Sequence, residues 1–199
     1  MKIENQIFYQ TATDRNYKVG DILEFGKILN GQGERILNST FCDAGQSHHS
    51  LGFEYLNSKN KKKNGPVLEK ICMSLAESDF VIRELAVESV RKEKYSHLPS
   101  RLSCMFVLDD KEKVLKGFKT FYQKGRGNHF QAIAVKLTGE IFYSKEVALP
   151  RAGLSYGQYQ EIADKYWSQN QSSQEETKEI LFEGKAEVVE ILNEYTIKK

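Results

Sequence analysis

The segment Leu102–Leu108 (LSCMFVL) constrains the fold more than any other, because it is an almost continuous apolar run of strand length. A short apolar run of this kind is typical of a strand that is covered on both faces. Pro99 stands before the run and Asp109-Asp110 follows it. We therefore predict a buried central strand at this place.

Helical periodicity lies on both sides of this strand. Apolar residues keep a helical spacing over Val67–Val90, which predicts one broken helix or two consecutive helices with a break at Ser78-Asp79. Pro99 stops this region, because the residue before a proline is disfavoured in the α conformation. The two aspartates after the strand are N-cap candidates for a helix with an apolar stripe over Val114–Tyr122, and Ser155 is the N-cap candidate of a third helix.

Short strand patterns occupy both ends of the chain. Thr138-Gly139 and Glu183-Gly184 are interpreted as turns that separate two pairs of strands. Strands and helices follow each other without a regular βαβ alternation, which favours an α+β fold over a doubly wound sheet. The other predicted strands are Ile7–Thr11, Asp21–Phe25, Ile133–Leu137, Glu140–Tyr143, Lys178–Phe182 and Ala186–Leu192.

The length and composition suit one domain over residues 1–199. With 199 residues and 40% hydrophobic content the chain can bury a substantial core. The stretch Asn30–Gly65 is rich in Gly, Asn, Ser, Lys and His with little periodicity, so we interpret it as a long loop or insertion.

The cysteines and the apolar pattern predict a cytoplasmic protein. Cys42, Cys72 and Cys104 are widely spaced and odd in number, which fits neither a disulfide framework nor paired zinc ligands and indicates a reducing compartment. The first residues, MKIENQIFYQ, contain no apolar signal-peptide core, and nowhere do eighteen apolar residues run together. We expect no membrane partner.

Charge and histidine spacing exclude some classes of site. The formal net charge of +2 is too small to predict nucleic-acid binding. The cluster Lys59–Lys63 is a solvated loop or, alternatively, a phosphate-binding patch. The four histidines do not have metal-ligand spacing, so we predict no metal site. Cys104 is either a buried, inert thiol or a nucleophile served by His97 or His129.

Three polar segments stand at the edges of predicted strands: Tyr9-Gln10-Thr11, Pro99-Ser100-Arg101, and Glu179 ahead of Ile180-Leu181-Phe182. Pro99 fixes its own φ, so Ser100 and Arg101 enter the sheet with a defined direction. An arginine presents a planar fork of donors suited to a phosphate or a carboxylate. The alternative for Arg101 is an internal salt bridge.

Four stretches of the chain carry a resemblance: Arg83–Tyr95 (RELAVESVRKEKY), Leu98–Cys104 (LPSRLSC), Tyr166-Trp167 and Glu179–Val189 (EILFEGKAEVV). They resemble a bacterial domain family of unknown function that is grouped with the ADP-ribosyltransferase-like fold. The resemblance covers most of the chain outside the Asn30–Gly65 loop. It implies a mixed or antiparallel sheet with flanking helices.

The same resemblance implies roles for particular residues. Tyr9, Gln10 and Thr11 take the place of the first transferase motif, which holds the nicotinamide end of NAD, with Gln10 where an arginine or histidine is usual. Ser100 with Arg101 resembles the middle motif and would help to bind NAD. Glu179, followed directly by an aliphatic strand, resembles the catalytic glutamate.

The function implied by the resemblance is transfer of ADP-ribose. The chain would bind NAD as a substrate, cleave the bond between nicotinamide and ribose, and pass ADP-ribose to a protein or nucleic-acid acceptor. Thr177, two residues before Glu179, departs from the pattern of transferases that modify arginine. The alternative is a binding module of the same fold, without catalysis, that takes up a nucleotide or a nucleic acid.

Overall fold

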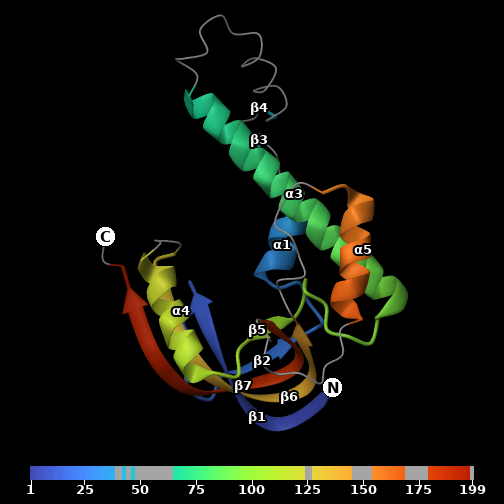
Figure 1. Ribbon diagram of the computed structural model, residues 1–199. Coiled ribbons are helices and arrows are strands. Elements are labelled where there is room, and N and C mark those ends of the chain that lie inside the picture. Colours follow the sequence, from blue (N-terminus) through green and yellow to red (C-terminus); the bar gives the residue numbers. More distant parts are fainter. Residues whose placement is uncertain are drawn as a thin grey trace, which may run out of the picture.

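The computed structural model (Figure 1) describes seven parts of the chain: residues 1–38, 42–43, 46–47, 65–123, 127–144, 154–168 and 179–197. The cluster Lys59–Lys63, the pair His48-His49 and Thr177 lie outside the described residues. No helix in the described part of the chain is long and apolar enough to cross a membrane.

A five-stranded antiparallel sheet forms the body of the protein. Its strands run in the order β1-β6-β7-β2, and β5 pairs with β7 beside this path. The short strands β3 (Cys42–Asp43) and β4 (Gln46–Ser47) pair separately. The strands of the main sheet are β1 (Lys2–Thr13), β2 (Ile22–Phe25), β5 (Met105–Val107), β6 (His129–Ser144) and β7 (Glu179–Thr196).

The four described helices are α1 (Gly31–Asn38), α3 (Gly65–Lys94), α4 (Lys111–Gln123) and α5 (Tyr156–Trp167). The α3 and α5 helices lie side by side, and α4 packs separately against β1 and β6 (Figure 1). Because the helices are segregated from an antiparallel sheet, the arrangement is α+β, as the sequence predicts.

The sheet curls because β5 reaches from β7 to β1. Phe106 pairs with Leu181 of β7, and the next residue but one, Leu108, exchanges two backbone hydrogen bonds of 2.8 Å with Tyr9 of β1. The central strand predicted over Leu102–Leu108 is shorter in the structure, where β5 covers Met105–Val107. Its first residues form a turn instead, in which the backbone nitrogens of Ser103 and Cys104 donate to the Ser100 carbonyl.

The β6 and β7 strands are continuous and strongly bent (Figure 1), which corrects the expectation of two pairs of short strands. Gly139 pairs directly with Gly184 where turns were predicted. Gly184 has φ +137°, and a Cβ on Gly139 would lie 2.2 Å from the Glu183 carbonyl oxygen. Two facing glycines thus let two long strands bend together without a break, because close backbone approach needs no side chain there.

The long helix α3 has no break at Ser78-Asp79, which corrects the alternatives of a broken helix or two helices. Asp79 Oδ1 instead accepts a 2.8 Å hydrogen bond from the Tyr159 hydroxyl of α5. Asp79 therefore joins α3 to α5 and does not interrupt the helix. Trp167 of α5 also donates from Nε1 to the Val87 carbonyl at 2.9 Å.

Helix α1 occupies the start of the segment Asn30–Gly65 that was predicted as a loop. Asn30 Oδ1 accepts from the Gly33 nitrogen at 2.8 Å, as an N-cap residue does. The caps that the sequence predicted for α4 and α5 are confirmed, since Asp110 Oδ1 accepts from the Glu112 nitrogen and Ser155 forms a capping box with Gln158. Asparagine and glycine in Asn30–Gly33 therefore start a helix, although their composition is typical of loops.

Alternation along the strands divides the apolar side chains between two faces of the sheet. Ile180 and Phe182 join the core enclosed by the curled sheet, together with residues of β1, β5 and β6. Leu181 points to the other face and packs with Phe142 against α3 and α5. The aromatic rings of Phe142, Tyr166 and Trp167 fill this second core, with centroids 4.7 to 5.8 Å apart.

The paired glycines generate the first prediction. Gly139→Ala should lower the free energy of unfolding by about 1 to 3 kcal/mol, because its Cβ would overlap the Glu183 carbonyl. Gly117→Ala, in the middle of α4 with nothing within 4 Å of the added Cβ, is the matched control and should raise stability by about 0.5 to 1 kcal/mol. Urea unfolding measures both, and an equally stable Gly139→Ala protein would contradict the bend described above.

Candidate functional site

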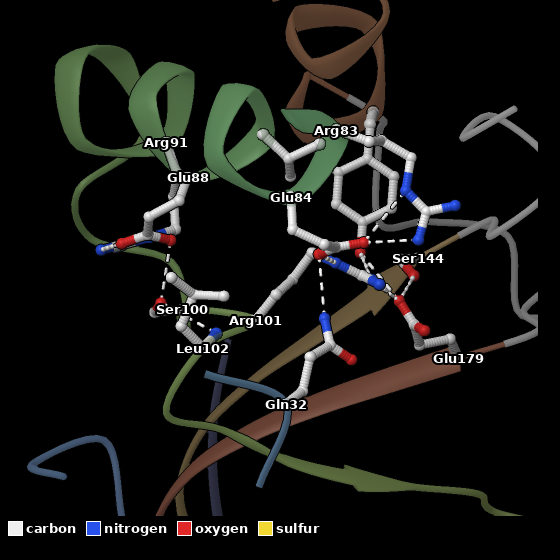
Figure 2. A network of polar contacts seen from close by, with 12 residues as sticks. Gln32, Arg83, Glu84, Glu88, Arg91, Ser100, Arg101, Leu102, Ser144 and Glu179 are labelled. Carbon is white, nitrogen blue, oxygen red and sulfur yellow. Dashed lines mark hydrogen bonds and ion pairs between the residues drawn. The ribbon is translucent and has the colours of Figure 1, made fainter. Parts of the chain in front are cut away.

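Arg101 lies in the turn that joins α3 to β5, and its guanidinium points beneath α3 (Figure 2). The turn is fixed by Asn30, whose Nδ2 donates to the carbonyls of Arg101 at 2.9 Å and Cys104 at 2.8 Å. Arg101 is 4% exposed. A buried arginine needs acidic partners, because desolvation of an unpaired charge is costly.

Two carboxylates and a phenol hold the Arg101 guanidinium. Nε donates to Glu84 Oε2 at 2.9 Å, and Nη1 donates to the Tyr166 hydroxyl at 3.0 Å and to Glu179 Oε1. The guanidinium also lies over the ring of Phe106, 5.4 Å from its centroid. Burial alone would lower the pKa of Arg101, but the surrounding acidic groups hold it well above its ordinary value. Arg101 is therefore a permanent cation that joins α3, α5 and β7.

Glu84 is the buried anchor of this network on α3. Besides Arg101, it accepts from Arg83 Nη2 at 2.6 Å and from Gln32 Nε2 of α1 at 2.9 Å (Figure 2). Burial raises its pKa, but the charges of Arg101 and Arg83 and their hydrogen bonds outweigh burial, so that the pKa of Glu84 lies below its usual value. Glu84 is thus ionised and fully bonded.

Glu179 stands at the start of β7 with one carboxylate oxygen tightly held. Oε1 accepts from Arg101, from the Tyr166 hydroxyl at 3.0 Å and from the Ser144 hydroxyl at 3.2 Å (Figure 2). Burial raises the pKa of Tyr166, so its phenol stays protonated and donates. Oε2 accepts no hydrogen bond from the described part of the chain. The carboxylate of Glu179 is therefore oriented through Oε1, and the residue lines the cleft described next.

A cleft of about 530 Å³ opens beside this network. Its volume is in the range of small-molecule binding sites. Five of the six residues predicted to form the site line it: Tyr9, Gln10, Thr11, Arg101 and Glu179. The other lining residues are Gln32, Phe80, Arg83, Phe106, Val107, Leu108, Lys113, Val114 and Gly117.

Ser100, the sixth predicted residue, does not line the cleft. Its hydroxyl donates to Glu88 Oε2 at 2.8 Å, and its backbone nitrogen donates to Glu183 Oε1 at 2.8 Å. Glu88 in turn pairs with Arg91 at 2.8 Å. The structure therefore places Ser100 in a second buried network that fixes the turn, next to the cleft residues in sequence but with its side chain bonded elsewhere.

Sequence reasoning missed Glu84, Gln32, Ser144 and the hydroxyl of Tyr166. A usable signal existed for the helix, because Glu84, Glu88 and Arg91 share the face of α3 that also presents buried Val87. Charged residues on an apolar face predict buried polar partners. Cys104 is 1% exposed, and burial raises the pKa of its thiol, which favours the inert thiol over the nucleophile.

Comparison with known proteins identifies a family. The sequence model described as a protein of unknown function (DUF2441) matches residues 8–194. The chain belongs to this family. No curated protein sequence matches the chain. The match includes every residue of the DUF2441 cleft. In the described part of this DUF2441 chain, no cluster of three histidine, cysteine, aspartate or glutamate side chains could hold a metal ion.

The buried ion pairs generate the second prediction. Arg101→Met should lower the free energy of unfolding by about 3 to 5 kcal/mol, because it leaves the buried Glu84 and the largely buried Glu179 without their shared cation. Lys94→Met is the control, since the Lys94–Asp164 pair is exposed, and it should leave stability unchanged. Chemical denaturation measures both, and similar stabilities for the two variants would contradict the central role of Arg101.

The lowered pKa of Glu84 generates a third prediction. A carboxylate whose pKa is lower in the folded state binds protons more readily when unfolded, so its stabilising contribution is present above its unfolded pKa and lost on acidification. Wild-type stability should therefore fall as the pH drops below the ordinary glutamate value of 4.5. Glu84→Gln should be less stable at pH 7 and should lose less further stability between pH 5 and 3. Parallel pH profiles of the two proteins would refute this assignment.

Proposed function

We propose that the cleft binds NAD and that Glu179 promotes cleavage of the bond between nicotinamide and ribose, with transfer of ADP-ribose to a protein or nucleic-acid acceptor. The single observation that carries this proposal is the state of Glu179, whose Oε1 is fixed by three donors beside a cleft of suitable size. A carboxylate held in this way is oriented before a ligand arrives, which is what electrostatic catalysis requires.

The chemical step assigns a task to the second oxygen of Glu179. When the bond between C1′ of the ribose and the nicotinamide nitrogen breaks, nicotinamide leaves with the electron pair and the ribose becomes cationic. Oε2 would face this positive charge, as a carboxylate does in glycoside hydrolysis. The acceptor oxygen or nitrogen then bonds to C1′ and loses a proton, for which a carboxylate is a suitable base. Water can act as the acceptor, giving free ADP-ribose.

The rest of the cleft suits a dinucleotide. Tyr9, Phe80 and Phe106 supply aromatic surface for flat rings, and Gln10, Thr11 and Gln32 supply polar groups. Lys113 also lines the cleft, and its side chain is 59% exposed. Its Nζ lies 3.8 Å from Asp110 Oδ2, so the ammonium group can turn towards a phosphate. Arg83 and Arg101 are balanced by the carboxylates of Glu84 and Glu179.

A second candidate function is nucleotide binding without catalysis. The observation that favours it is the ion pair itself, because Arg101 neutralises part of the charge that Glu179 would offer to a ribose cation. Gln10 in place of a cationic residue points the same way. Both candidates require NAD or a related nucleotide in the same cleft, and they differ in whether nicotinamide is released.

The fourth prediction separates these candidates. Incubation with NAD should raise the melting temperature of wild type and release nicotinamide. Glu179→Gln should retain the melting shift but release nicotinamide about 100 to 1,000 times more slowly, because it removes the charge that stabilises the transition state. Glu24→Gln, at an exposed position of β2 outside the cleft, is the matched control and should behave as wild type.

The possible outcomes divide cleanly. A melting shift without nicotinamide release in wild type supports the binding module and removes the catalytic proposal. Release that survives Glu179→Gln unchanged removes Glu179 from its role. If NAD produces neither effect, the catalytic proposal falls, and so does NAD as the ligand of the binding module.

A further inference from the structure

The side-chain oxygen of Gln10 is buried and has no hydrogen-bond partner among the residues that the structure describes. Gln10 lies on β1, opposite Ile133 of β6, and it lines the cleft. Buried polar atoms in proteins nearly always find a partner, so an unpaired one needs an explanation. An amide oxygen that is shielded from water and unpaired destabilises the structure that contains it.

Among the described residues, His129 Nε2 is the other buried side-chain atom without a hydrogen bond. It lies 3.2 Å from Glu194 Oε1, so a carboxylate lies next to it. Gln10 Oε1 has no hydrogen-bond partner in the described part of the chain, and an uncharged amide forms no ion pair. The difference singles out Gln10, which lies at the cleft, as the position where a donor is missing.

We propose that Gln10 Oε1 accepts a hydrogen bond from an exocyclic amino group of the bound ligand, so that Gln10 selects ligands that carry such a group. This inference rests on the proposed function, in which the ligand is NAD. The Gln10 side chain rotates about three bonds, which allows its oxygen to meet a group in the cleft. Binding would then replace an unsatisfied acceptor with a satisfied one.

NAD carries two exocyclic amino groups, one on the nicotinamide carboxamide and one at position 6 of adenine. Both are N–H donors, and an amide side chain recognises either through the same chemistry. Two analogues distinguish them. Nicotinic acid adenine dinucleotide replaces the carboxamide with a carboxylate, and nicotinamide hypoxanthine dinucleotide replaces the adenine amino group with an oxygen.

The experiment measures dissociation constants of NAD and the two analogues by calorimetry, for wild type, Gln10→Met and Gln160→Met. Methionine keeps the length of the side chain and removes the amide. Gln160 is a half-buried glutamine of α5 that does not line the cleft, so Gln160→Met is the matched control. Wild type and the control should bind one of the two analogues at least about 10-fold more weakly than NAD.

Gln10→Met should bind NAD and that analogue with equal affinity, and the identity of the weak analogue shows which amino group is recognised. If wild type binds NAD and both analogues equally, or if Gln10→Met keeps the full discrimination, the inference about Gln10 is wrong while the NAD site stands. If wild type binds none of the three dinucleotides, the proposed function itself fails. If Gln10→Met does not fold, the affinities of wild type for the three ligands still show whether the protein recognises an exocyclic amino group of the ligand.

Discussion

The interaction on which the structure depends is the ion pairing of buried Arg101 with Glu84 and Glu179. It connects the turn before β5 with helix α3 and with the first residue of β7. Burying the guanidinium of Arg101 would be costly without these two acidic partners, and removing the arginine would leave the buried carboxylate of Glu84 only partly compensated. The same contacts that stabilise the fold also orient Glu179 at the cleft, so stability and the proposed chemistry share one network.

The curled sheet brings the residues of the cleft together. Facing glycines at positions 139 and 184 let β6 and β7 bend together, and Leu108 bonds to Tyr9 so that β5 joins β7 to β1. Residues of β1 and β7 that are more than 160 positions apart in sequence, such as Gln10 and Glu179, thereby line one cleft. Helix α5 adds the Tyr166 hydroxyl, which donates to Glu179.

Features that depend on neighbouring residues could be predicted from the sequence, whereas contacts between distant residues could not. Asp110 and Ser155 cap helices because capping depends on residues two or three positions away, and β1, β2 and the α+β class follow from local periodicity. Gly139 and Gly184 were wrongly predicted as turns, because a glycine is common both in turns and in bent strands. Which of the two forms depends on the strand that pairs with it. The hydroxyl of Ser100 bonds to Glu88 rather than facing the cleft, and neither this partner nor that of Gln32 is encoded by spacing along the chain.

The central claim is that Glu179 presents its second oxygen to the ribose of a dinucleotide in this cleft. A crystal structure of the protein with ADP-ribose and nicotinamide, or with an uncleavable NAD analogue, tests this most directly. We expect the ligand to lie between β1, α4 and Glu179, with Oε2 of Glu179 within hydrogen-bond distance of the ribose and Oε1 still bonded to Arg101. A ligand bound away from Glu179, or a cleft that stays empty at saturating ligand concentration, would contradict it.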